Sequence, residues 1–215
     1  GVEPQSETNW RLANNYNVPR IGFVNKMDRQ GSNFLNVCKQ VKEMLGSHAL
    51  PLQIPIGNEA DFKGVVDLIN FKGIVWNEED QGMTFKEVEI PSEIIDEARE
   101  YRSKLLEAVA EFDDNLLEKY FDDENSLTER EILDALREAT ISGKVVPMMC
   151  GSAFKNKGVQ TMLDMVMEIL PSPLDVEAIE GINPKTGGEE KRKPDANEPF
   201  SALAFKIATD PYVGR

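Results

Sequence analysis

Several features that define large classes of protein are missing from this sequence of 215 residues. It contains two cysteines and one histidine, so it offers neither a disulfide framework nor a zinc site of paired Cys-x-x-Cys motifs. It has no run of 18 or more apolar residues and no signal peptide at its first residues, GVEPQSETNW. We therefore expect a cytoplasmic protein that holds reduced thiols and makes no contact with a membrane.

Positive charge is also scarce, and the deficit is confined to one segment. Residues 77–139 contain 21 acidic and 7 basic residues, whereas the rest of the chain contains 17 of each. The net charge of −14 argues against direct sequence-specific binding to nucleic acid. The uneven distribution predicts a separate acidic module set in a neutral host.

Helix and strand patterns alternate in the first 56 residues. A helix is predicted to start at Glu3-Pro4, and Arg20–Val24 forms a short apolar run typical of a buried strand. A second helix is predicted from a cap at Ser32 to Gly46, followed by a strand over Leu50–Ile56. This alternation indicates an α/β domain with a parallel sheet.

The pattern changes between residues 57 and 142, where strands come first and helices second. We predict strands over 64–68, 72–76 and 85–90, then a long helix opened by Pro91-Ser92 and another helix opened by a capping box at Thr128. Helical spacing predicts an inward face and an outward face for the long helix. The inward residues are Ile94, Ala98, Tyr101, Leu105 and Val109, and the outward ones are Asp96, Glu97, Glu100, Glu107 and Glu111.

The α/β pattern returns over residues 143–175, so residues 57–142 are predicted to be a small α+β insert in the host. Lys144–Cys150 is a predicted buried strand, and an amphipathic helix follows it. Residues 176–199 are rich in proline and contain Gly187-Gly188, which predicts a linker. A strand from Phe200 to Ala208 is predicted to open a further domain over residues 200–215.

The loop after the first strand, Asn25-Lys26-Met27-Asp28, carries a chemical signal. In open α/β sheets, ligands bind beyond the carboxyl ends of the strands. An ionised Asp28 can accept both adjacent donors of a guanine base, N1–H and the exocyclic amine, and adenine offers no such pair. Taken alone, the four-residue pattern could equally be a solvated turn, but its position after a strand favours guanine recognition.

The neighbouring residues suit the same role. Asn25 could bond the other edge of the base or brace the loop, and the stem of Lys26 could lie across the flat base with its ammonium in water. Gly151-Ser152-Ala153 follows the next predicted host strand. The small residues Ser152 and Ala153 would allow a backbone N–H to approach the base oxygen.

Five stretches of the sequence resemble the elongation factor G family of translational GTPases. They follow the family's order and together span nearly the whole chain: GVEPQSET, VPRIGFVNKMDR, KVVPMMCGSAFKNKGVQ, LPSPLD and PFSALAFKIATDPYVGR. The resemblance implies that Asn25-Lys26-Met27-Asp28 is the guanine-specificity motif and Gly151-Ser152-Ala153 the second loop that contacts the base. It also implies a partial P-loop-type GTPase domain that binds GTP or GDP, with Mg²⁺ in the complete protein.

The resemblance further implies that the protein works on the ribosome in the cytoplasm and promotes translocation. The acidic insert resembles the subdomain that interrupts the family's GTPase domain and approaches the ribosomal stalk protein, and the last stretch resembles the start of a β-barrel domain. From the residues alone, the acidic helices are by default ordinary solvated faces, and a docking surface for a basic partner is the alternative. Related alternatives are an acidic adaptor without nucleotide, or a ribosomal-protection or release-factor GTPase.

One family motif is missing. No Gly-x-x-x-x-Gly-Lys-[Ser/Thr] occurs in the sequence, so the phosphate cradle and its hydroxyl for Mg²⁺ are not here. The chain also begins without a Met, and His48 matches no family motif and is predicted to be a surface residue before a strand. We therefore expect an internal fragment that carries guanine recognition, contains no catalytic residue and does not hydrolyse GTP by itself.

Overall fold

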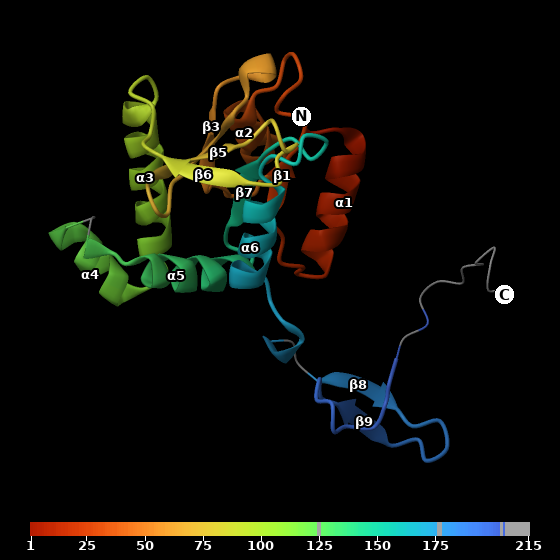
Figure 1. Cartoon of the computed structure of the whole chain (residues 1–215). Coiled ribbons are helices and arrows are strands. Elements are labelled where there is room, and N and C mark those ends of the chain that lie inside the picture. The colour runs from red at the N-terminus through yellow and green to blue at the C-terminus, as the bar shows by residue number, and fades with distance from the viewer. Residues whose placement is uncertain (124–125, 176–177, 203, 205–215) are drawn as a thin grey trace, which may run out of the picture. The chain divides into compact units, whose positions relative to one another are not determined.

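The computed structural model describes residues 1–123, 126–175, 178–202 and 204 (Figure 1). The chain divides into two compact units, Gly1–Leu170 and Pro171–Arg215. Within the described ranges, no helix combines the length and the apolar character needed to cross a membrane.

A parallel sheet of three strands forms the base of the first unit, in the order β1 (Gly22–Val24), β7 (Val146–Cys150) and β2 (Ala49–Pro51). Two helices accompany its N-terminal strands, α1 (Pro4–Asn15) and α2 (Phe34–Leu45). The sheet with its flanking helices confirms the predicted α/β fold class.

Strand β7 is the centre of this sheet and is buried on both faces. Cys150 pairs with Val24 of β1, and Val146 pairs with Ala49 of β2. The side chains of Val146, Met148 and Cys150 enter one apolar cluster together with α2, whereas Met149 enters the other. Burial on both faces explains why this strand is a continuous apolar run rather than an alternating one.

The prediction of a single strand over Leu50–Ile56 is wrong, because the structure divides this segment between two strands in different sheets. β2 ends at Pro51, and β3 (Gln53–Ile56) belongs to a separate antiparallel sheet. Leu52 joins the sheets: its N–H donates to Met148 O at 2.9 Å, and its carbonyl accepts from Leu68 N at 3.1 Å. The apolar pattern does not reveal the change of sheet, because buried apolar residues alternate along the whole segment: Leu50, Leu52, Ile54 and Ile56.

The antiparallel sheet continues through β4 (Gly64–Asp67), β5 (Lys72–Trp76) and β6 (Phe85–Val88) in chain order. These three strands match the predicted ones, with β4 one residue shorter and β6 two residues shorter. A short 3-10 turn, η1 (Glu59–Asp61), lies between β3 and β4. The sheet contributes Val66 to one apolar cluster and Val65 to the other, so both of its faces are covered.

Three helices follow the antiparallel sheet: α3 (Ile95–Ala110), α4 (Asp114–Asp122) and α5 (Glu129–Ile141). Figure 1 shows α3 and α4 on the side of the unit away from α1. The predicted capping box is present, because Thr128 N donates to Glu131 Oε2 at 2.9 Å and Glu131 N donates to Thr128 Oγ1 at 3.4 Å. The two faces predicted for α3 are confirmed: its five acids are exposed, while Ala98, Leu105 and Val109 are buried.

Helix α6 (Val159–Ile169) packs against α5 and completes the first unit. The cap predicted at Ser32 is displaced by one residue: Asn33 caps α2 by accepting from Asn36 N at 2.9 Å, and Gly46 ends the helix in the left-handed conformation as predicted. Ser32 instead donates its hydroxyl to Met27 O at 2.8 Å. His48 is exposed just before β2, as expected.

Both cysteines are free and buried. Cys150 lies in the core, as predicted, and burial raises the pKa of its thiol. Burial likewise raises the pKa of Cys38 to about 12. Since the thiolate is the reactive form, both side chains act as small apolar residues.

The second unit contains a β-hairpin where a linker was predicted. β8 (Ile179–Ile182) pairs with β9 (Glu189–Arg192), after a 3-10 turn, η3 (Pro173–Asp175). Asn183 builds the turn by accepting from Lys185 N at 2.8 Å through its side chain, and Gly187 supplies a φ of 71°. The strands bury no apolar face, since Ile179 and Ile182 are exposed, so hydrophobic periodicity could not predict them.

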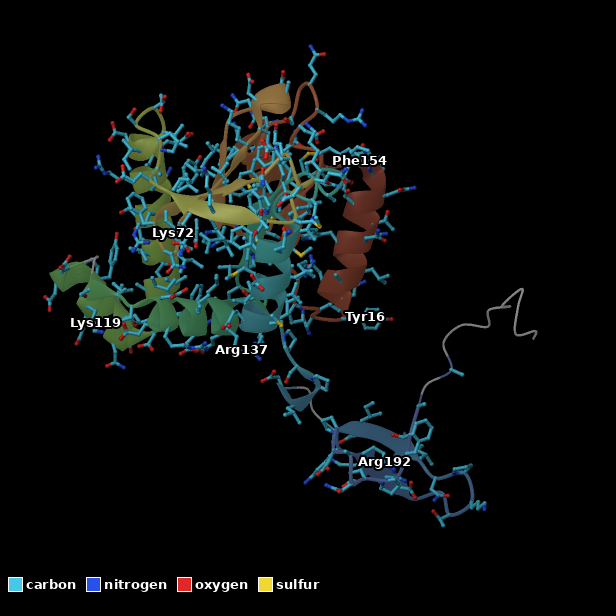
Figure 2. All side chains as sticks on the ribbon, viewed as in Figure 1. Tyr16, Lys72, Lys119, Arg137, Phe154 and Arg192 are labelled. Carbon is cyan, nitrogen blue, oxygen red and sulfur yellow. The ribbon has the colours of Figure 1, made fainter. Side chains whose placement is uncertain are left out.

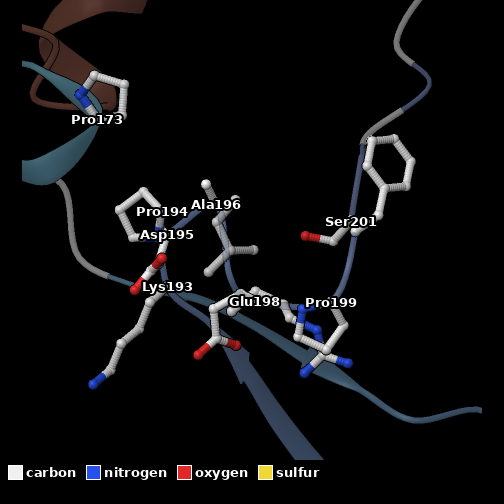
Figure 3. A pocket seen from close by; sticks show the side chains of 11 residues that line it. Pro173, Lys193, Pro194, Asp195, Ala196, Glu198, Pro199 and Ser201 are labelled. Carbon is white, nitrogen blue, oxygen red and sulfur yellow. The ribbon is translucent and has the colours of Figure 1, made fainter.

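A hollow of about 660 Å³ lies within the second unit, lined largely by the proline-rich segment after β9 (Figure 3). None of the predicted guanine-site residues lines it. The strand predicted from Phe200 to Ala208 falls almost wholly outside the described residues.

The junction between the two sheets predicts a specific loss of stability. Leu52→Ala removes a side chain that is 1% exposed, and we expect a decrease of about 2–5 kcal/mol in the free energy of unfolding. Urea unfolding followed by circular dichroism measures it. Leu12→Ala, at a residue that is 54% exposed, is the matched control and should change stability by less than about 0.5 kcal/mol. Equal effects at the two positions would refute the importance of the junction.

Candidate functional site

Two loops meet beyond the carboxyl ends of β1 and β7. Backbone hydrogen bonds extend the pairing of these strands into the loops: Gly151 N donates to Val24 O at 3.0 Å, and Met27 N donates to Gly151 O at 3.0 Å. The parallel register therefore places the predicted motif at residues 25–28 directly beside the predicted second loop at residues 151–153.

Asn25 braces the two loops. Its side-chain oxygen accepts from Lys26 N at 2.7 Å and from Ala153 N at 2.9 Å. Of the two roles considered for Asn25, the structure therefore shows the bracing one. The Ala153 N–H, expected to face a base oxygen, is engaged by Asn25 in this structure.

Lys26 occupies the exposed bend of the first loop. Its φ of 64° lies in the left-handed region, and its carbonyl accepts from Arg29 N at 3.0 Å to close a turn. The Lys26 side chain is solvent-exposed. This leaves its apolar stem free to cover a flat ligand while the ammonium remains in water.

Asp28 is fixed by the second loop. Ser152, which is 1% exposed, donates its hydroxyl to Asp28 Oδ1 at 2.7 Å, and Lys155 Nζ lies 4.0 Å from Asp28 Oδ2. The Ser152 hydrogen bond holds the pKa of Asp28 below its ordinary value, against the opposing effect of burial. The result is an ionised carboxylate that is held in one orientation and can accept further donors.

Met27 and Gly151 are packing residues. Met27 is 1% exposed and belongs to the apolar cluster beneath the first loop. A Cβ on Gly151 would lie 2.3 Å from Lys157 O and 2.7 Å from the Phe23 ring. Glycine at this position therefore permits the second loop to turn back on itself and to pack against Phe23 of β1.

Three residues of the second loop were not predicted from the sequence. Lys155 supplies the positive charge near Asp28, and Lys157 is a buried lysine that is 1% exposed. Phe154 is 98% exposed, and Figure 2 shows it at the surface of the first unit. The only sequence signal for this cluster is the stretch Phe154-Lys155-Asn156-Lys157 directly after Ala153.

The residues around Asp28 do not fit a magnesium ion. Mg²⁺ requires carboxylates and water in octahedral arrangement, whereas Asp28 is faced by the Ser152 hydroxyl donor and the Lys155 cation. Across the part of the chain that the structure describes, no group of three or more His, Cys, Asp or Glu side chains is arranged to hold a metal. The geometry instead suits a neutral planar ligand with adjacent hydrogen-bond donors.

Comparison with known proteins gives consistent results. The sequence model of the elongation factor Tu GTP binding domain matches residues 1–172. The chain is 69% identical over all 215 residues to elongation factor G of Cytophaga hutchinsonii and 58% identical to elongation factor G of Amoebophilus asiaticus. It spans 31% and 30% of the length of these relatives. The crystal structure of ttk003000868 from Thermus thermophilus is similar with a TM-score of 0.71 and 26% identity, over 87% of this chain and 29% of that one.

The hydrogen bond between Ser152 and Asp28 predicts a measurable titration shift. Ser152→Ala removes the main cause of the lowered pKa of Asp28, so we expect this pKa to rise toward its ordinary value. A carboxyl-carbon NMR titration measures the shift. Ser142→Ala, which removes a hydroxyl bonded to Ala139 O, is the control and should leave the Asp28 titration unchanged.

The sign of the pH effect on stability follows from the same bond. A lowered folded-state pKa contributes stability above the unfolded pKa, and this contribution is lost as pH falls through the folded value. The difference in the free energy of unfolding between neutral and acid pH should therefore be smaller in Ser152→Ala than in the wild type. An unaltered pKa of Asp28 in this variant would show that Ser152 is not the cause.

Proposed function

The chain belongs to the family of the elongation factor Tu GTP-binding domain, and we propose that it supplies guanine recognition to a ribosome-dependent elongation GTPase that promotes translocation. The single observation that carries this proposal is the Asp28 carboxylate, ionised and oriented by Ser152 at the meeting point of the two loops. The predicted resemblance to elongation factor G is confirmed by the 69% identity over the whole chain. The proposed setting is the cytoplasm.

The base would bind beside Asp28. A carboxylate with one oxygen held by Ser152 keeps lone pairs for the adjacent N1–H and amine of guanine, and an adenine would leave that buried acceptor without donors. We propose that the exposed stem of Lys26 covers the face of the base. Asn25 and Ala153 hold the two loops at a constant separation, which favours a planar ligand of one size.

We propose that these residues bind neither the phosphates of the nucleotide nor its Mg²⁺. The sequence contains no Gly-x-x-x-x-Gly-Lys-[Ser/Thr] motif, and the Asp28 surroundings do not fit Mg²⁺. We propose GTP or GDP as the ligand, recognised here through the base. The chain would contribute selectivity for guanine and leave hydrolysis to groups outside the two loops.

The acidic face of α3 is proposed to dock a basic partner on the ribosome, with the stalk protein as the candidate. Five acids of this helix are exposed, and two of them form ion pairs within the helix, Asp96 with Arg99 and Glu100 with Lys104. The other three form no ion pair with any residue that the structure describes: Glu97, Glu107 and Glu111. We propose residues 57–142 as the inserted subdomain that carries this face.

Replacing Asp28 by Asn tests base selection in the full-length protein that contains these residues. Asp28→Asn puts a donor where the guanine donors approach, so we expect GDP binding to weaken by about 2–4 kcal/mol. Xanthine carries an acceptor where guanine has its amine, and the variant should therefore shift toward XDP. Titration calorimetry with both nucleotides measures the change, with Asp164→Asn on the exposed face of α6 as the control. Unchanged GDP affinity would show that Asp28 does not contact the base.

Neutralising the unpaired acids of α3 tests the docking proposal. The triple variant Glu97→Gln, Glu107→Gln and Glu111→Gln should slow association with ribosomes or isolated stalk protein, chiefly at low salt, because a local negative field accelerates encounter with a basic partner. Stopped-flow association rates at low and high ionic strength measure it. GDP affinity should not change, since Asp28 lies in the loop after β1 of the parallel sheet and not on α3.

A second triple variant loses the same number of negative charges elsewhere, and so separates the effect of the local field of α3 on the association rate from the effect of net charge. It removes three exposed acids that lie outside residues 77–139: Glu7→Gln, Asp164→Asn and Glu198→Gln. We expect this variant to associate at the wild-type rate. If both triple variants behave alike, the acids of α3 are a solvated face and docking there is refuted.

A further inference from the structure

We propose that Lys157 is a positioning residue for the guanine base, and that its ion pair with Glu78 ties the loop between β5 and β6, residues 77–84, to the nucleotide site. The proposal rests on the proposed guanine recognition and extends it to a regulatory link. It joins a surface loop of the antiparallel sheet to a site built on the parallel sheet.

Lys157 is a buried charge with two specific partners. Its ammonium donates to Phe62 O at 3.0 Å and to Glu78 Oε1 at 2.6 Å, while the side chain is only 2% exposed. Burying a lysine is costly unless it is paired and hydrogen-bonded. An apolar residue would pack in this place at lower cost, so the lysine is there for the contacts that its ammonium makes.

The backbone of Lys157 leads directly to the base-reading carboxylate. Ser152 N donates to Lys157 O at 2.9 Å, and Lys157 N donates to Ser152 O at 3.0 Å. The Ser152 hydroxyl in turn donates to Asp28 Oδ1 at 2.7 Å. A continuous series of contacts therefore runs from Glu78 through Lys157 and Ser152 to Asp28.

A second set of contacts holds the same two loops together. Gly82 O accepts from Asn156 Nδ2 at 3.1 Å and from Gln160 Nε2 at 2.9 Å. Gly82 has a φ of 76°, and a Cβ on it would lie 2.5 Å from Lys155 O. The loop of residues 77–84 is thus packed against residues 155–157 of the second loop, with backbone close to backbone at Gly82.

The Glu78 end of this link is accessible. The Glu78 side chain is 72% exposed, whereas the ammonium that it pairs with is buried. A basic group of a partner can reach this carboxylate and compete with Lys157 for it. Because coupling between two sites is reciprocal, a partner that draws Glu78 away would weaken guanine binding, and bound guanine nucleotide would oppose that partner.

The test compares two neighbouring acids of one loop in the full-length protein. Glu78→Gln removes the partner of Lys157, and Glu79→Gln removes the same charge from an adjacent exposed residue that forms no ion pair within the described part of the chain. We expect Glu78→Gln to weaken GDP binding about fivefold or more and Glu79→Gln to leave it unchanged. We expect both variants to fold, because the amide oxygen that Glu78→Gln introduces can still accept from the Lys157 ammonium, which also keeps its hydrogen bond to Phe62 O.

The nucleotide IDP provides a readout that a general loss of stability would not move. Its hypoxanthine base lacks the exocyclic amine, so the ratio of the GDP and IDP dissociation constants reports the contact with Asp28. If Lys157 positions Ser152 and hence Asp28, the preference for GDP over IDP should shrink in Glu78→Gln. Equal weakening of both nucleotides would overturn the positioning role.

Hydrogen exchange in the nucleotide-free protein tests the link separately from ligand binding. The amides of Ser152 and Lys157 should exchange faster in Glu78→Gln than in the wild type or in Glu79→Gln. Unchanged exchange would overturn the link between the loops. A wild-type protein that binds neither GDP nor IDP would refute the proposed function and the positioning role together, and the exchange rates would still decide whether Glu78 holds the loop.

Discussion

The hydrogen-bonded pairing of β7 with β1 on one side and β2 on the other is the constraint on which the first unit depends. It brings together loops that are far apart in the chain, so that Ser152 meets Asp28 across 124 residues. The pairing requires β7 to be buried on both faces, and apolar side chains from α2, α5 and α6 cover it. The candidate site is thus a product of the sheet's register, because a shift of one residue would separate Asn25 Oδ1 from Ala153 N.

Two of the attachments between the antiparallel sheet and this framework are at Leu52 and at the loop before β6. Leu52 lies where the chain leaves the parallel sheet and enters the antiparallel one, and its backbone is hydrogen-bonded to both sheets. In the loop before β6, Glu78 and Gly82 accept hydrogen bonds from Lys157 and Gln160, next to the site. The loop of residues 77–84 is therefore more than an exposed connection between β5 and β6. Its Glu78 supplies the counter-charge for Lys157, the lysine buried beneath the second site loop.

Sequence reasoning succeeded where local chemistry decides the structure. The capping box at Thr128, the helix end at Gly46 and the two faces of α3 follow from patterns within a few residues. The two motifs were noticed because each follows a short apolar strand, β1 or β7, of which only β7 is fully buried. It failed where distant residues decide. The change of sheet at Leu52 depends on partners in β7 and after β4, and the hairpin of β8 and β9 depends on turn geometry at Asn183 rather than on an apolar face. The bond between Ser152 and Asp28 and the burial of Lys157 likewise become visible only when the loops are brought together.

The position of β7 in the chain has a consequence for the order of folding during synthesis. In the described structure β1 and β2 pair with no strand other than β7, which follows them by roughly a hundred residues, whereas β3 to β6 pair in chain order through short connections. Local pairings close small loops and form early, whereas the parallel strands must await a distant partner. Within this segment, the antiparallel sheet can therefore form during synthesis before β7 is available to pair with β1 and β2. Until β7 emerges, the strand edges of β1 and β2 that later pair with it are open to mispairing and to chaperones.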